Sequence, residues 1–200
     1  MDRVDLRGVA VFRGALDPEA QVRVLSDLRV IVAAAPLLRP ETRRGRKMSV
    51  RMTSAGRVGW ISDRRGYRYA ARHPGGGAWP DIPQSLLALW NAHAGADRAP
   101  DTCLVNFYGE GARMGLHQDR DEADLSHPVL SLSLGDEALF RVGNVASGAP
   151  TESLWLRSGD LAVIGGAARL VHHGVDRIRF GSSSLLPDGG RVNVTLRVAT

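Results

Sequence analysis

Cysteine is almost absent from the chain, because its 200 residues include only Cys103. One cysteine cannot form an internal disulfide or a cysteine-based zinc cluster, so both are excluded. Long apolar runs are also missing: the longest uncharged apolar stretch covers the nine residues Val30 to Leu38, against ~20 for a transmembrane helix. The first residues, MDRVDLRG, carry charges where a signal peptide has its apolar core. We therefore expect a cytoplasmic protein.

Lysine is nearly missing too, since Lys47 is the only basic residue that is not an arginine. The net charge is +5, and it is unevenly placed. Residues 39–72 hold eleven basic residues against Glu41 and Asp63, a local charge of +9, which leaves −4 for the rest of the chain. Such a basic excess indicates a partner with many negative charges, such as nucleic acid, and a solvated basic face is the alternative.

The composition, with 44% hydrophobic and 24% charged residues, is typical of an ordinary globular domain, and the length favours a single domain over residues 1–200. One helix is predicted from the N-cap residue Asp17 to about Pro36, and a second from about Pro83 to Gly95. Short alternating segments then predict strands at 102–108, 113–117, 128–134, 137–142, 153–156, 160–164, 169–173, 178–182 and 191–198. This order predicts a mostly β fold with flanking helices (α+β), a β-sandwich or jelly roll. We expect residues 1–100 to form a helical extension of a β core at 101–200.

The last predicted strand alternates between apolar and polar side chains. Its apolar members, Val192, Val194, Leu196 and Val198, share one face, as period-two alternation requires. The opposite face carries Arg191, Asn193, Thr195 and Arg197. Two arginines in a row predict an anion site that can hold both ends of a dicarboxylate, and a solvated outer face is the alternative.

Two further polar groups fall on predicted strands. Asn106 and Tyr108 share one face of the strand at 102–108 and are suited to orienting a bound acid. His117 and Asp119 project to the same side of an extended segment. With one distant histidine they would form the two-histidine, one-carboxylate triad of non-haem iron oxygenases. Spacing alone leaves the third ligand open among His73, His93, His127, His172 and His173.

Taken together, these motifs resemble the AlkB family of Fe(II)- and 2-oxoglutarate-dependent dioxygenases. The run from Asn106 to Glu122, NFYGEGARMGLHQDRDE, is similar to that family's N-x-Y-x-x-G…H-x-D-x-x-E signature. Residues 191–197, RVNVTLR, are similar to its R-x-N-x-T-x-R ending. The resemblance covers about residues 48–197. It implies a double-stranded β-helix (jelly roll) core with an N-terminal nucleotide-recognition lid.

The resemblance also implies the cofactors Fe(II), 2-oxoglutarate and O2. It assigns iron to His117, Asp119 and a distal histidine, where the family's R-L-x-x-H-G stretch matches residues 169–174 and favours His173 over His172. The implied contacts to 2-oxoglutarate are Asn106, Tyr108, Ser131, Arg191, Asn193, Thr195 and Arg197.

For the substrate, the resemblance implies that residues 48–69 form the lid. Trp60 would stack on a flipped base, whose positive charge after alkylation suits an indole face. Asp121 and Glu122 would favour that cationic base and accept a hydrogen bond from its exocyclic amine. The remaining implied substrate contacts are Met48, Tyr67, Arg51 and Arg65, the arginines at phosphates.

The implied activity is oxidative dealkylation of bases such as 1-methyladenine and 3-methylcytosine, with release of formaldehyde. We expect single-stranded DNA as the substrate, with RNA as an alternative, and a monomeric enzyme. Two other hypotheses remain at this point. The same iron core could act on a protein, a lipid or a free nucleotide, or the chain could be a metal-free nucleic-acid-binding module.

Overall fold

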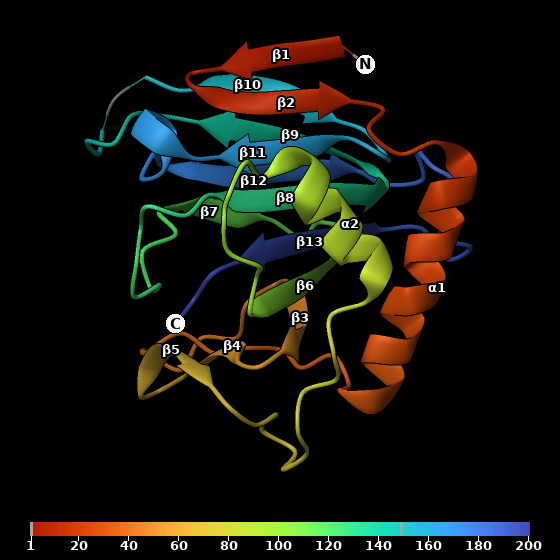
Figure 1. Cartoon of the computed structure of the whole chain (residues 1–200), viewed down its shortest axis with the longest axis vertical. Helices are drawn as coiled ribbons and strands as arrows, with labels where there is room; N and C mark the ends of the chain where they lie inside the picture. Colours follow the sequence, from red (N-terminus) through yellow and green to blue (C-terminus); the bar gives the residue numbers. More distant parts are fainter. Residues whose placement is uncertain (1, 149) are drawn as a thin grey trace.

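The computed structural model describes residues 2–148 and 150–200, which fold into two facing antiparallel β-sheets flanked by two helices (Figure 1). The seven-stranded sheet has the order β1-β2-β11-β8-β13-β6-β3, and the four-stranded sheet has the order β10-β9-β12-β7. The strands of the larger sheet are β1 (Asp2–Leu6), β2 (Val9–Arg13), β3 (Arg51–Gly56), β6 (Thr102–Tyr108), β8 (Val129–Gly135), β11 (Leu161–Ile164) and β13 (Arg191–Arg197). Those of the smaller sheet are β7 (Met114–His117), β9 (Glu137–Val142), β10 (Glu152–Leu156) and β12 (His173–Arg179). This mostly β arrangement confirms the predicted fold class.

The first hundred residues contribute more to the sheet than the sequence indicated. Strand β2 pairs with β11, and β3 pairs with β6, so both extend the seven-stranded sheet beyond the strands of the second half. The expected division at residue 100 into an extension and a core is therefore wrong. Val9 and Val11, which fill the space between the sheets, are fully buried and explain why this segment belongs to the core.

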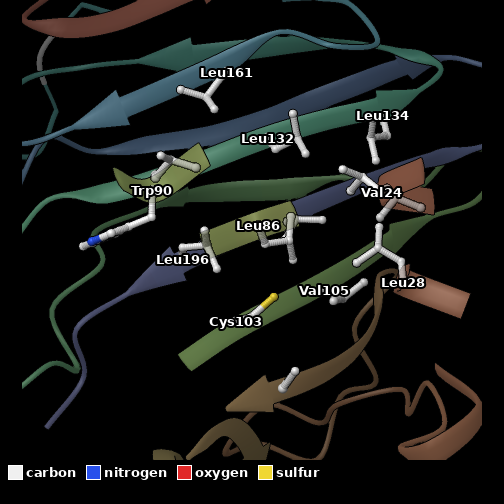
Figure 2. Packing of buried hydrophobic residues seen from close by; sticks show 14 of the residues in the cluster. Val24, Leu28, Leu86, Trp90, Cys103, Val105, Leu132, Leu134, Leu161 and Leu196 are labelled. Atoms are coloured by element: carbon white, nitrogen blue, oxygen red, sulfur yellow. The ribbon is translucent and has the colours of Figure 1, made fainter. Parts of the chain in front are cut away.

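Two helices cover the outer face of the seven-stranded sheet. Helix α1 (Pro18–Ala34) begins as predicted, with the Asp17 side chain accepting a hydrogen bond from the Ala20 backbone N–H at 2.7 Å. Helix α2 (Gln84–His93) packs Leu86 and Trp90 into the apolar cluster between the helices and the seven-stranded sheet, to which α1 contributes Leu28. Cys103 on β6 is buried among these side chains (Figure 2). Burial raises the pKa of its thiol to about 12, which suits an inert core position.

Strand β13 divides its side chains as the alternation predicted. Val192, Val194 and Leu196 pack into the core beneath the helices. The polar side chains of the same strand turn to the space between the two sheets, where they line a cavity. The alternative of a solvated outer face is excluded, because every residue of β13 is buried.

The expected strands at 169–173 and 178–182 are wrong. Residues 166–168 form a 3-10 turn, and one strand, β12, runs from His173 to Arg179. A β-bulge between Val175 and Arg177 leaves Asp176 and Arg177 both exposed. Two consecutive exposed residues interrupt the period-two pattern, so the sequence predicts a turn where the strand continues through a bulge.

A small two-stranded sheet completes the fold. Strands β4 (Gly59–Asp63) and β5 (Gly66–Ala70) form a hairpin that lies at one end of the molecule, near β3 (Figure 1). The hairpin carries Trp60 and Tyr67 to the rim of the cavity between the sheets. Among the described residues, no helix is both long and apolar enough to cross a membrane.

Candidate active site

A cavity of about 550 Å³ lies between the two sheets. One wall comes from β6, β8 and β13, the other from β7, β9 and β12, and the β4–β5 hairpin adds side chains at the rim. The structure brings together at this cavity the predicted residues Met48, Trp60, Tyr67, Asn106, Tyr108, His117, Asp119, Asp121, Ser131, His173, Arg191, Asn193, Thr195 and Arg197.

His117, Asp119 and His173 form one cluster. Their ligand atoms all lie within 4.8 Å of one another, with Asp119 Oδ1 3.6 Å from His117 Nε2 and Asp119 Oδ2 3.5 Å from His173 Nε2. His117 and His173 are paired residues in the ladder between β7 and β12, which puts both rings on the same face of the sheet. His173, and not His172, therefore lies in the cluster that could hold a metal ion. Its neighbour His172 makes a contact to the Asn144 carbonyl at 3.0 Å instead.

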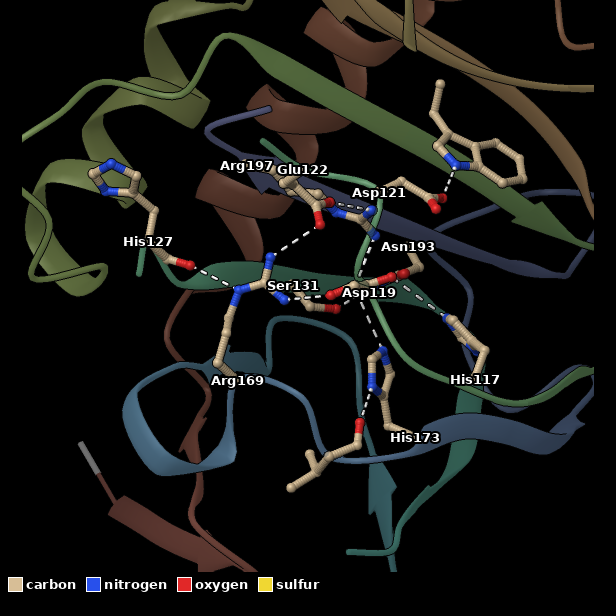
Figure 3. Close-up of polar contacts among 12 residues, drawn as sticks. His117, Asp119, Asp121, Glu122, His127, Ser131, Arg169, His173, Asn193 and Arg197 are labelled. Atoms are coloured by element: carbon tan, nitrogen blue, oxygen red, sulfur yellow. Dashed lines mark hydrogen bonds and ion pairs between the residues drawn. The ribbon is translucent and has the colours of Figure 1, made fainter. Parts of the chain in front are cut away.

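Backbone carbonyls fix the two imidazole rings. His117 Nδ1 lies 2.9 Å from the Gly115 carbonyl oxygen, and His173 Nδ1 lies 3.1 Å from that of Val171. Since a carbonyl only accepts, each Nδ1 donates, which leaves each Nε2 unprotonated in the neutral ring. Figure 3 shows both rings turned toward Asp119. Desolvation and the neighbouring His173 lower the pKa of His117, which favours the neutral form that binds metals.

Asp119 is buried but charged. Burial alone would raise its pKa, yet Arg197 and the two histidines hold the pKa of this carboxyl well below its usual range. Arg197 Nη2 donates to Asp119 Oδ2 at 2.9 Å. Two neutral imidazoles and one carboxylate form the donor set that suits Fe(II) and leaves coordination positions open. The residues present therefore fit the iron that the sequence implied.

Arg191 is a buried cation that lacks an anion. Its Nη2 donates to Ser133 Oγ at 2.9 Å, and its guanidinium carbon lies 5.1 Å from the centre of the Tyr108 ring. Within the described residues, its Nε and Nη1 find no hydrogen-bond acceptor. An unpaired guanidinium in a cavity wall fits a carboxylate of 2-oxoglutarate, which would satisfy both N–H groups.

Neutral polar groups complete this wall of the cavity. Asn193 Nδ2 donates to Ser131 Oγ at 2.8 Å and to the Leu132 carbonyl at 3.0 Å. Asn106 keeps a buried carboxamide oxygen with no partner among the described residues. These groups, with Thr195, lie on the strand face that the sequence predicted for the acid site.

Glu122 does not lie where the sequence placed it. Its side chain is 0% exposed and accepts hydrogen bonds from Tyr69 Oη at 2.7 Å, Arg197 Nη1 at 3.0 Å and Arg169 Nη2 at 3.1 Å (Figure 3 draws the arginine contacts). The prediction that Glu122 contacts the base is therefore wrong, because two arginines and a tyrosine occupy its oxygens. Arg197 and Tyr69 hold the pKa of Glu122 below its usual range against the opposing effect of burial.

Arg169 and Gln118 are two site residues to which the sequence analysis assigned no role. Arg169 Nη1 donates to the Asp119 carbonyl at 2.6 Å, and its Nε donates to the His127 carbonyl at 2.7 Å. Gln118 Nε2 donates to the Leu170 carbonyl at 2.6 Å. Both stand inside the quoted motifs, but their spacing carries no sign of these backbone contacts.

The rim of the cavity is aromatic and basic. The Trp60 and Tyr67 rings stack with centroids 5.5 Å apart and planes at 21°, and Trp60 Nε1 donates to Asp121 Oδ2 at 3.0 Å. Arg43, which the sequence did not single out, lines the cavity beside them. Of the predicted phosphate contacts, Arg51 lies 4.7 Å over the Phe107 ring and Arg65 is exposed. Neither lines the cavity, so their contact with phosphates stays a prediction.

A two-histidine, one-carboxylate cluster beside an anion-binding arginine, inside a jelly roll, defines the class of iron- and 2-oxoglutarate-dependent dioxygenases. The family model of the 2OG-Fe(II) oxygenase superfamily matches residues 8–197. Among relatives, the chain is 54% identical over 193 residues to an alpha-ketoglutarate-dependent dioxygenase AlkB homolog of Caulobacter vibrioides, covering 96% of this chain and 88% of that protein.

Two further relatives agree with this class. The chain is 38% identical over 185 residues to alpha-ketoglutarate-dependent dioxygenase AlkB of Escherichia coli, covering 90% of this chain and 85% of that protein. The solved structure of OsALKBH1 superposes with a TM-score of 0.82 at 31% identity, covering 98% of this chain and 99% of that one. The chain belongs to the AlkB family of Fe(II)- and 2-oxoglutarate-dependent dioxygenases.

Proposed function

We propose that this enzyme removes alkyl groups oxidatively from N-alkylated nucleobases such as 1-methyladenine and 3-methylcytosine. The observation that carries the proposal is the Trp60–Tyr67 stack on a basic hairpin, at the rim of the cavity that holds the iron triad. The names of several relatives point the same way, since proteins of Arabidopsis thaliana that match this chain are called DNA N(6)-methyladenine demethylases.

The inner end of the cavity is suited to holding the cosubstrate. His117, Asp119 and His173 would hold Fe(II), while Arg191 would pair with the distal carboxylate of 2-oxoglutarate beside Tyr108. Arg197 and Asn106 would serve the keto-acid end, which would bind the iron. When bound, Fe(II) with 2-oxoglutarate and O2 supplies the oxidation of the N-alkyl carbon, which leaves as an aldehyde while 2-oxoglutarate becomes succinate and CO2.

The rim is suited to holding the base. An extruded base loses its stacking neighbours, and the Trp60 indole offers a face that also attracts the positive charge of an alkylated ring. Asp121, now hydrogen-bonded to Trp60, presents a carboxylate that can accept from the exocyclic amine of that base. The +9 charge of residues 39–72 supplies the attraction for phosphates.

We further propose single-stranded DNA as the preferred substrate, because extrusion from a duplex requires unpairing that costs a few kcal/mol. The triad and the anion wall are complete without residues from a partner, and we propose a monomer that acts as one domain over residues 1–200. A nucleic-acid substrate and a cosubstrate from central metabolism favour the cytoplasm.

Formaldehyde release tests the proposal. The protein is loaded with Fe(II) without oxygen and then opened to air with 2-oxoglutarate and a single-stranded oligonucleotide that carries one 3-methylcytosine. We expect formaldehyde only with the methylated strand and only with 2-oxoglutarate, and none from Asp119→Ala. Consumption of 2-oxoglutarate without formaldehyde from any methylated DNA or RNA strand would contradict the proposed substrate and leave the dioxygenase core intact.

A further inference from the structure

Two consecutive carboxylates accept hydrogen bonds from the β4–β5 hairpin, which Ser62 also ties to the Glu41 carbonyl and whose Ala70 carbonyl accepts from Trp79. Trp60 and Tyr69 are directly paired residues in the ladder of this hairpin, and each donates one hydrogen bond. Trp60 Nε1 donates to Asp121, and Tyr69 Oη donates to Glu122 at 2.7 Å. Asp121 is exposed and lines the cavity, so a ligand that donates to its carboxylate can take the place of the Trp60 hydrogen bond. The contact of Tyr69 is part-buried, and the Glu122 side chain that accepts it is 0% exposed.

The contact of Tyr69 leads directly to the metal ligands. Glu122 Oε1 accepts from both Tyr69 Oη and Arg197 Nη1, and Arg197 Nη2 donates to Asp119 Oδ2 at 2.9 Å. Tyr69 Oη also accepts from Arg197 Nη1 at 3.3 Å. An unbroken chain of hydrogen bonds thus joins the hairpin to Asp119 through one carboxylate and one guanidinium.

Arg169 makes this chain rigid from the other side. Its Nη2 holds the second oxygen of Glu122, and its Nη1 holds the backbone carbonyl of Asp119. With Arg169 holding both Glu122 and Asp119, the Tyr69 hydroxyl is, among the described residues, the one group through which the hairpin joins this chain of hydrogen bonds. When the hairpin lifts, Glu122 loses a donor and Arg197 loses an acceptor in a site where each lost hydrogen bond is expensive.

We propose that Glu122 and Tyr69 are positioning residues that couple the seating of the hairpin to the orientation of Arg197 and Asp119. A nucleic-acid strand that seats the hairpin therefore raises the affinity for 2-oxoglutarate, and 2-oxoglutarate raises the affinity for the strand by the same factor, as linkage requires. This inference rests on the proposed function for the identity of the strand. It assigns Glu122 a role between two sites and not at the base.

Calorimetry on the Fe(II)-loaded protein under nitrogen measures this coupling. The affinity for 2-oxoglutarate is determined with and without a saturating single-stranded oligonucleotide that carries 3-methylcytosine. We expect the oligonucleotide to tighten 2-oxoglutarate binding by about 5-fold or more in the unsubstituted protein, and by a factor of about 1 in Tyr69→Phe. Phenylalanine keeps the ring and removes only the hydroxyl, so the fold is retained, which thermal unfolding checks.

Two more variants sharpen the result. Glu122→Gln keeps the shape of the side chain, removes its charge and is expected to lose the coupling as Tyr69→Phe does. Asp63→Asn is the matched control, because Asp63 lies on the same hairpin, pairs with Arg68 at 2.8 Å and does not line the cavity. Asp63→Asn should keep the full coupling factor. Equal coupling in Tyr69→Phe and the unsubstituted protein would overturn the inference.

A second measurement separates this inference from the proposed function. If fluorescence anisotropy shows that the oligonucleotide does not bind, the proposed function fails, and hydrogen exchange of residues 59–70 then decides the inference. We expect 2-oxoglutarate to slow amide exchange in this hairpin in the unsubstituted protein and not in Tyr69→Phe. Equal protection in both proteins, or none in either, would contradict the coupling.

Discussion

The inner end of the cavity and its rim are built on different principles. At the inner end, the anion-binding side chains stand on β6, β8 and β13 of the seven-stranded sheet, and those of β13 are buried, as Arg191 is at 1% exposure. At the rim, Trp60 and Tyr67 stand on a two-stranded hairpin, and Tyr67 is 44% exposed. A strand inside a sheet is paired on both sides, as β13 is with β6 and β8, whereas each strand of the hairpin pairs only with the other. The molecule thus separates fixed oxidation chemistry from adaptable substrate binding.

The largest expected effect comes from the triad. His173→Ala should bind no stoichiometric iron after anaerobic reconstitution and should lose turnover, because two of the three ligands cannot hold the ion in the required geometry. His172→Ala is the matched control for iron content, since His172 contacts the Asn144 carbonyl and lies outside the cluster. Metal analysis of both variants decides between the two neighbouring histidines. Iron lost from His172→Ala and retained in His173→Ala would reverse the assignment.

The second largest effect is expected at Arg191, the unpaired cation at the inner end of the cavity. Arg191→Met should raise the KM for 2-oxoglutarate by about 30-fold or more, the equivalent of at least ~2 kcal/mol for a buried charge pair. The same variant should unfold at no lower temperature than the unsubstituted protein when 2-oxoglutarate is absent, because it removes a buried charge that lacks a counter-ion. Steady-state kinetics measure the KM, and thermal unfolding without 2-oxoglutarate measures the stability. A large loss of stability without cosubstrate would show that Arg191 has a structural role.

At the rim, Trp60→Ala should weaken binding of the methylated strand and leave the affinity for 2-oxoglutarate alone unchanged. Stacking of a base on an aromatic ring contributes about 1–3 kcal/mol, so the KM for the oligonucleotide should rise by about 5- to 150-fold. Trp60→Phe should retain much of the binding, since it keeps an aromatic face. If Trp60→Ala shifts both affinities in the strand-free protein, the two ends of the cavity are not separable.

The smallest effect belongs to the exposed arginines. Arg65→Ala should weaken binding of methylated and unmethylated single strands equally, because a phosphate contact carries no information about the base. The slope of log affinity against log salt should fall by about 0.7, the value for one neutralised phosphate on a single strand. Titrations at several salt concentrations measure it. An unchanged slope would remove Arg65 from the binding surface.

The sequence predicted best what depends on local alternation. The polar face of β13 and the pair Asn106 and Tyr108 followed from period two alone, and the structure turns both into the same cavity. Alternation did not suffice to predict the triad, because spacing left the third ligand open among several histidines. The motif favoured His173, and the pairing of β7 with β12 explains that preference physically.

The sequence failed where long-range contacts decide. The family resemblance implied that Glu122 contacts the base, but two distant arginines pair with it and bury it. Periodicity cannot predict these ion pairs, since Arg169 and Arg197 lie far from Glu122 along the chain. The bulge in β12 was missed for a local reason, because it breaks the very alternation by which strands are recognised.

The pairing of His117 with His173 across the β7–β12 ladder has a mechanical consequence. A metal ion bound by both rings joins two strands whose ligands are separated by 55 residues of chain. Because the three ligands come together only in the folded chain, the binding free energy of the ion adds to the stability of the fold. A chain with a single cysteine cannot make that cross-link from sulfur. The catalytic ion therefore also links β7 to β12, and its removal should weaken the pairing of these two strands.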